Sequence, residues 1–237
     1  MSMSSDEKLL RIEQRSSVTW IVFEAQRAGR ALDGHLGEQL VEALRKLRRD
    51  ASLRCVVITG EDRTFYSHAP CDRDCAVCSG SLDAQIVSQL RALPVPIIAA
   101  INGDAVGAGA AIALSCDLRF VSEDARLIFA PLASTRSPAA GLSWSLPRTV
   151  GRSRALELLF TGRPILASEA LQWGLVAQVV QPGDLVSAVE TVTAELALVP
   201  RNRLAGIKRS VNHAEDVDFD EAAEFERLIA EIPTDED

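Results

Sequence analysis

The side chains with the most evident capacity for chemistry gather in one stretch of eleven residues. They are His68, Cys71, Asp72, Asp74, Cys75 and Cys78. Histidine has a pKa near neutrality, which makes His68 a candidate base, and Asp72 could orient it or replace it. Cysteine thiolates together with histidine could instead hold zinc, and the C-x3-C-x2-C spacing also occurs in some iron–sulfur enzymes. A solvated loop with inert thiols is the simplest alternative.

A second candidate site lies in the stretch from Ile97 to Val121. An apolar run typical of a buried strand leads through a turn into Gly107-Ala108-Gly109, and an apolar, helix-like segment follows to Ser115. The first N–H groups of a helix lack intrahelical acceptors, and they lie at the positive end of its dipole. Small residues let a ligand oxygen approach these groups, so the pattern predicts an oxyanion hole. A tightly packed turn without a ligand is the alternative.

Strand and helix patterns alternate around these two candidate sites. Strands are predicted for 9–13, 18–23, 55–59, 97–101, 118–121, 126–129 and 176–180, and helices for 33–49 and 81–93. Residues 61–80 are predicted to form an irregular loop. This order indicates an α/β fold with a parallel sheet, and the chain from Asp184 onward is mostly helical in pattern.

Composition and charge narrow the class of protein. The chain has 237 residues, of which 47% are hydrophobic, and its net charge of −8 argues against non-specific nucleic-acid binding. No apolar run is long enough to cross a bilayer, and the first residues lack the pattern of a signal peptide. We therefore expect a cytoplasmic protein with no membrane partner, in which the five cysteines stay reduced.

Three stretches together resemble the enoyl-CoA hydratase/isomerase family, the crotonase superfamily. They are VVITGEDRTFYSHA, PVPIIAAINGDAVGAGAAIALSCDLRFVSEDARL and SLPRTVGRSRALELLFTGRPILASEALQWGLVAQVV. The resemblance implies a crotonase-like spiral of ββα units, with a core over residues 1–180. Residues 181–237 would form a helical region of the same domain that supports a homotrimer or homohexamer. It also implies an enzyme of fatty acid metabolism, a lyase or isomerase acting on an acyl-CoA, with coenzyme A as part of the substrate and no other cofactor or metal.

Two backbone N–H groups hold the thioester oxygen in this family. Its motif, written roughly F-x-A-G-A-D, matches residues 65–70 here, so the resemblance makes Ala69 one donor, beside His68. The middle residue of a glycine triplet supplies the other, which is Ala108. The resemblance further places the following residues at the substrate: Ser67, Gly107, Gly109, Ala111, Pro131, Ala139 and Trp144.

The acids that the family uses are missing from this chain. Hydratases of the family carry glutamates at the positions of Ala111 and Pro131, and some isomerase-like relatives carry an aspartate at Ala139. Alanine and proline cannot perform general acid–base catalysis. Three hypotheses remain: an acyl-CoA enzyme with a displaced acid–base group, a non-catalytic acyl-CoA binder or partner subunit, and a loop metal-binding protein.

Other residues have two interpretations each. Arg136 could hold a substrate carboxylate or lie solvated on the surface, and Trp144 could line the pocket or pack in the core. Lys208 and Arg209 lie where the family often has a basic residue near the nucleotide phosphates, but an ordinary solvated helix face fits them equally well.

Overall fold

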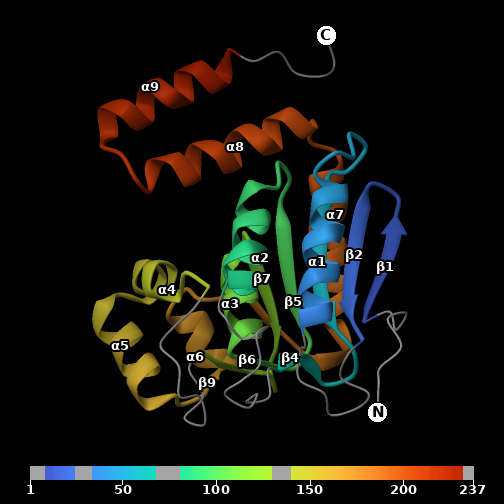
Figure 1. Cartoon of the computed structure of the whole chain (residues 1–237), viewed down its shortest axis with the longest axis vertical. Helices are drawn as coiled ribbons and strands as arrows, with labels where there is room; N and C mark the ends of the chain where they lie inside the picture. The colour runs from blue at the N-terminus through green and yellow to red at the C-terminus, as the bar shows by residue number, and fades with distance from the viewer. Residues whose placement is uncertain (1–8, 25–33, 68–80, 130–139, 232–237) are drawn as a thin grey trace.

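The fold is a spiral of β-β-α units that builds two sheets (Figure 1). The computed structural model describes residues 9–24, 34–67, 81–129 and 140–231. Successive units run β3-β4-α2, β5-β6-α3 and β7-β8-α4, and each places its first strand in the larger sheet and its second in the smaller one. The expected α/β spiral is therefore confirmed.

The larger sheet has six strands in the order β1-β2-β3-β5-β7-β10. β1 and β2 form an antiparallel hairpin, and the remaining neighbours are parallel. Its central strands are buried on both faces, which explains their continuous apolar runs. The bounds are Leu10–Arg15, Val18–Phe23, Cys55–Gly60, Ile97–Ile101, Leu118–Ser122 and Gln178–Val180.

Of the smaller sheet, the sequence patterns predicted only the strand at 126–129. This sheet has the order β4-β6-β8-β9, with bounds Thr64–Ser67, Asp104–Val106, Arg126–Ile128 and Ile165–Leu166. The prediction of an irregular loop over 61–80 is wrong where β4 lies. A Cβ on Gly60 would lie 2.0 Å from the Thr64 carbonyl oxygen, and one on Gly103 1.8 Å from that of Arg63. Glycine at these corners therefore lets the chain pass from one sheet to the other.

Helices cover both faces of the larger sheet. α1, α2 and α3 contribute to the main apolar core on one face, and Leu36, Leu40 and Leu44 of α1 are fully buried there. α7 packs on the other face, where Leu185 and Val189 contact a second cluster. The helices are α1 Gly34–Leu47, α2 Ser81–Ala92, α3 Ala108–Ser115, α4 Leu142–Val150, α5 Arg152–Thr161, α6 Ala167–Gln172, α7 Leu185–Ala197, α8 Arg201–Ala214 and α9 Phe219–Ala230, with a 3₁₀ turn at Pro182–Asp184.

The last two helices project from the rest of the fold as a hairpin (Figure 1). α9 contains no buried residue, and Phe219 at its start is 83% exposed. Across the parts of the chain that the structure describes, no helix combines the length and the apolar character that a membrane span requires.

Candidate functional site

The turn from β6 into α3 depends on Gly107. Its backbone has φ 59° and ψ −113°, a conformation that suits glycine and strains other residues. The Gly107 N–H donates to the Ile128 carbonyl of β8 at 2.7 Å, and its carbonyl accepts from the Ala111 N–H at 3.1 Å. The helical ladder starts with that second bond. The N–H groups of Ala108 and Gly109 precede it in the first turn and have no acceptor within the helix.

Close packing explains the next glycine. A Cβ on Gly109 would lie 2.3 Å from the carbonyl oxygen of Tyr66 and 2.8 Å from its Cβ. The start of α3 is thus in direct contact with β4. Ser67 is the last described residue of that strand and pairs with Val106. Both predicted donors, Ala69 and Ala108, come two positions after this pair along the chain, although Ala69 itself lies outside the described residues.

The two ends of α3 differ in how their backbone groups are satisfied. Arg119 is half-buried and donates to the carbonyls of Leu114 and Cys116 at the end of the helix, and also to that of Leu175. The Cys116 thiol bonds to the Ile112 carbonyl at 3.3 Å, and burial raises its pKa to about 12. Protein groups therefore satisfy the carboxyl end, which leaves the positive amino end as the part of α3 suited to a ligand.

The face of α3 that carries Ala108 offers no acid or base. Ala111 is one turn further on and only 2% exposed, and the Ser115 hydroxyl donates to its carbonyl at 2.7 Å. The first turn of α3 contains no acidic residue. A proton donor or acceptor for chemistry at Ala108 must therefore come from another segment.

Trp144 lies at the opposite end of α3 from Ala108. Its ring stacks against the guanidinium groups of Arg91 and Arg148, whose Cζ atoms are 4.5 and 4.3 Å from the ring centroid. It is half-buried and lines a cavity of about 810 Å³ between α8, α4 and the end of α3. Trp144 is thus a cavity wall, and its contact with a substrate stays a prediction.

Lys208 does not lie on a solvated helix face. Its ammonium group is buried and donates to Asp117 Oδ2 at 2.7 Å and to the carbonyls of Leu90 and Val95 at 3.3 Å each. Asp117 Oδ2 also accepts from the Ile97 N–H at 2.8 Å. Lys208 therefore ties α8 to the larger sheet, and its interpretation as a solvated helix face is wrong. A contact of this residue with nucleotide phosphates stays a prediction.

Several predicted site residues fall outside the described part of the chain. They are His68, Ala69, Cys71, Asp72, Asp74, Cys75, Cys78, Pro131, Arg136 and Ala139. Within the described ranges, no group of three or more His, Cys, Asp or Glu side chains is placed to hold a metal ion. Burial raises the pKa of the Cys55 thiol to about 12, so this cysteine is structural in character. Sequence reasoning also missed Arg119 and its three carbonyl partners, because no local pattern marks them.

Comparison with known proteins gives one consistent family. A profile described as enoyl-CoA hydratase/isomerase matches residues 13–237. The chain is 33% identical over 199 residues to 1,2-epoxyphenylacetyl-CoA isomerase of Escherichia coli, which covers 80% of this chain and 76% of that protein. It is 29% identical to 4-chlorobenzoyl coenzyme A dehalogenase-1 of an Arthrobacter species, over 98% of this chain and 88% of that protein.

A solved structure agrees with these sequence matches. The crystal structure of an enoyl-CoA hydratase from Bacillus anthracis superimposes with a TM-score of 0.89 at 28% identity, covering 94% of this chain and 90% of that chain.

Proposed function

Because the chain belongs to the enoyl-CoA hydratase/isomerase family, we propose that it acts on the thioester carbonyl of an acyl-CoA and that the Ala108 N–H polarises this carbonyl. The observation that carries the proposal is the Gly107 turn, which leaves the first N–H groups of α3 without helical acceptors. Both relatives named above carry coenzyme A in their names but differ in reaction. Relatives that share a coenzyme A thioester but catalyse different reactions support a common ligand, with a reaction that varies between members.

The proposed chemistry is the stabilisation of negative charge on the thioester oxygen. As the substrate reacts, electrons move from the thioester carbonyl bond onto its oxygen. N–H groups that are already oriented by Gly107 stabilise this charge without reorganising, and the helix dipole adds to the effect. We assign the second donor to Ala69, on the family motif.

The acid–base step is where this chain departs from ordinary hydratases. The residues at the three acid positions, Ala111, Pro131 and Ala139, have no ionisable side chain. We propose that His68 supplies the proton transfer instead, because it precedes the Ala69 donor in the sequence and histidine is the residue type whose ordinary pKa suits proton transfer at neutral pH. This chain would therefore polarise the thioester and use one displaced base. These groups suit isomerisation or hydrolysis of an acyl-CoA better than hydration, in which two glutamates add water.

The first test uses crotonyl-CoA and a panel of other acyl-CoA thioesters. We expect hydration of crotonyl-CoA to be slower than that of an ordinary hydratase by about 10²–10⁴, since a general acid–base group is worth that factor. The same thioesters should bind in calorimetry, and at least one should turn over. Hydration at the ordinary rate would contradict the displaced base. If the thioesters bind but none turns over, the protein is a non-catalytic acyl-CoA binder and the proposed enzymatic activity is refuted.

A further inference from the structure

The side-chain amide of Asn102 joins two corners of the chain. At each corner a strand of the larger sheet passes into a strand of the smaller one: β3 into β4, and β5 into β6. Asn102 lies in the second corner, and its amide bonds to residues of the first. Gly103, the next residue, packs so closely on the first corner that a Cβ there would lie 1.8 Å from the Arg63 carbonyl oxygen. The two corners are therefore packed and bonded together.

Both ends of this amide have backbone partners. Its Nδ2 donates to the carbonyl of Asp62 at 2.9 Å and to that of Thr64 at 3.4 Å. Its Oδ1 accepts from the Gly60 N–H at 3.0 Å. These partners fix the orientation of the amide, because a reversed amide would turn its donor toward an N–H and its acceptor toward two carbonyls.

The corner between β3 and β4 has an unusual backbone. Asp62 has φ 53°, in the left-handed region that residues other than glycine seldom adopt. A conformation of this kind persists only where its surroundings hold it. The Asn102 amide bonds to Asp62 itself and to the residues on either side, Gly60 and Thr64. It therefore holds the turn from which β4 starts.

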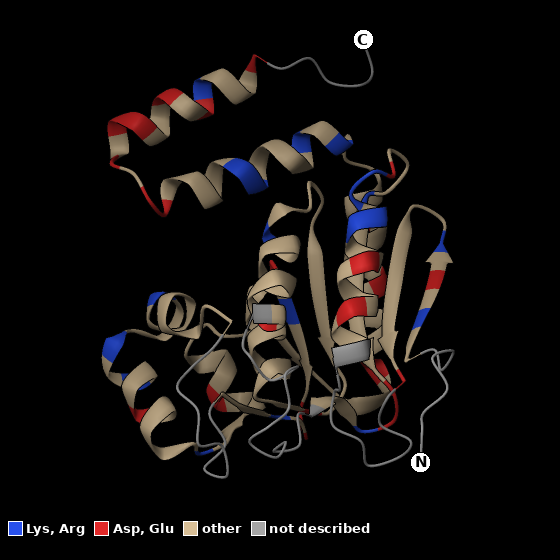
Figure 2. Cartoon of the chain, viewed as in Figure 1, with Lys and Arg blue, Asp and Glu red and all other residues tan. Residues whose placement is uncertain are grey.

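Charged pairs tie the smaller sheet less firmly. Asp104 of β6 pairs with Arg126 of β8, and Arg63, just before β4, pairs with Asp124. Figure 2 shows charged segments of both signs at this lower edge of the fold. Both arginines are exposed, so water and salt weaken these pairs. The half-buried amide of Asn102 is the contact that salt does not screen.

β4 and β6 lead to the two proposed donors. The strands pair in parallel, with Ser67 opposite Val106 at their ends. In the sequence, Ala69 follows Ser67 by two residues and Ala108 follows Val106 by two. A shift of β4 along β6 would therefore displace one donor relative to the other.

We propose that Asn102 is a positioning residue, which sets where the two N–H donors lie relative to the thioester oxygen. The inference rests on the proposed function, because it takes Ala69 and Ala108 as these donors. Asn102 precedes β6 and Ala108 follows it, and the three residues of that strand rise about 3.3 Å each. Asn102 thus acts through the backbone and does not touch the substrate.

Infrared difference spectroscopy of bound crotonyl-CoA, isotopically labelled at its carbonyl carbon, tests this role. Hydrogen bonds from the donors polarise the carbonyl and lower its stretching frequency, whether or not the thioester turns over. We expect this lowering in the wild type, and we expect Ala108→Pro and Asn102→Ala each to lose much of it. For the best acyl-CoA substrate, Asn102→Ala should lower kcat by about tenfold to a hundredfold and leave KM within about twofold, since a misplaced donor affects the transition state most.

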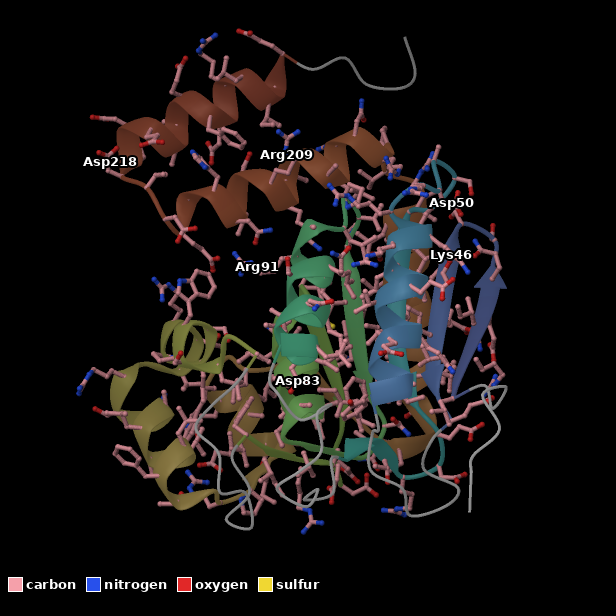
Figure 3. All side chains as sticks on the ribbon, viewed as in Figure 1. Lys46, Asp50, Asp83, Arg91, Arg209 and Asp218 are labelled. Carbon is pink, nitrogen blue, oxygen red and sulfur yellow. The ribbon has the colours of Figure 1, made fainter. Side chains whose placement is uncertain are left out.

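The matched control is Asp50→Ala. Asp50 also holds a turn beside β3, because its carboxylate accepts from the Ser52 N–H at 2.9 Å. Figure 3 shows Asp50 at the opposite end of the fold from β4 and β6, which Figure 1 labels. Its loss should leave the carbonyl frequency unchanged and kcat within about twofold of the wild type.

A second variant, Asn102→Asp, has nearly the same size. It keeps an acceptor for the Gly60 N–H but turns an oxygen toward the carbonyls of Asp62 and Thr64. It should lose at least as much as Asn102→Ala, and it replaces that variant in the test if alanine abolishes the circular dichroism of the fold.

Two results would overturn the inference alone, provided that Ala108→Pro reduces the lowering of the frequency. One is a folded Asn102 variant with the wild-type frequency and kcat, and the other is an equal loss in Asp50→Ala. If crotonyl-CoA does not bind to the wild type, or binds without any lowering of the frequency, the proposed function itself fails and this inference fails with it.

Discussion

At the scale of single residues, Gly107 links the local backbone to the proposed chemistry. Its backbone conformation, φ 59° and ψ −113°, sets the direction in which α3 starts. The hydrogen bond from its N–H to the Ile128 carbonyl stabilises the turn. Gly109 serves a different purpose, since a side chain there would collide with the backbone of Tyr66. Of the two glycines, Gly107 is the one whose conformation sets the direction of the Ala108 N–H.

The change Gly107→Ala should therefore damage both stability and binding. Alanine in this conformation costs about 1–3 kcal/mol, so we expect a loss of that size in the free energy of unfolding, measured with urea. Acyl-CoA affinity should fall as well, because the first turn of α3 would move. Gly183→Ala is the matched control, since a Cβ at this position meets no atom within 4 Å. Equal behaviour of the two variants would mean that the turn has no special role.

At the scale of elements, Lys208 and Asp117 fasten α8 to the fold. The pair is made at 2.7 Å, and two carbonyls complete the bonding of the ammonium group. Removing one partner of a buried pair leaves the other charge uncompensated. The resulting loss in the free energy of unfolding is far larger than the loss on breaking a surface pair.

The change Lys208→Met tests this fastening. We expect the free energy of unfolding to fall by about 3 kcal/mol and α8 to lose protection from hydrogen exchange. Lys46→Met is the control, because Lys46 is exposed and pairs only with Glu42, four residues earlier on α1. That change should cost less than about 1 kcal/mol. A loss at Lys208 no larger than the loss at Lys46 would refute the assigned role.

Elements also show where sequence reasoning succeeds. The leucine spacing of α1 and the apolar run of β5 were predicted correctly, because burial of one helix face or of a whole strand imposes a pattern on the residues. β4 and β6 have four and three residues, which are too few to show the alternation of apolar and polar residues that marks a strand. They form because they pair with neighbouring strands. The start of α3 at Ala108 was found from its small residues. The burial of Lys208 could not be found, because its partners are 91 to 118 residues away along the chain.

At the scale of the whole molecule, the exposed apolar side chains of the C-terminal hairpin suggest assembly. Phe219 is 83% exposed, Val211 61% and Ile207 56%, and α9 is amphipathic in sequence but contains no buried residue. We predict a homotrimer or homohexamer in solution. Light scattering coupled to size exclusion should give three or six times 25.6 kDa, and Phe219→Ser should shift the protein toward smaller species. A monomer at micromolar concentration would contradict this prediction.

The most direct test of the account is the change Ala108→Pro, compared with Ala108→Gly. Proline removes the N–H at the first position of α3, where a proline ring is tolerated, and glycine keeps that N–H. With folding verified by circular dichroism, we predict that Ala108→Pro lowers turnover of the best acyl-CoA substrate by about 10²–10³, or weakens binding of that thioester by about 1–3 kcal/mol. Ala108→Gly should retain most of both. If folded Ala108→Pro matched the wild type in turnover and in affinity, the Ala108 N–H would not be the oxyanion donor.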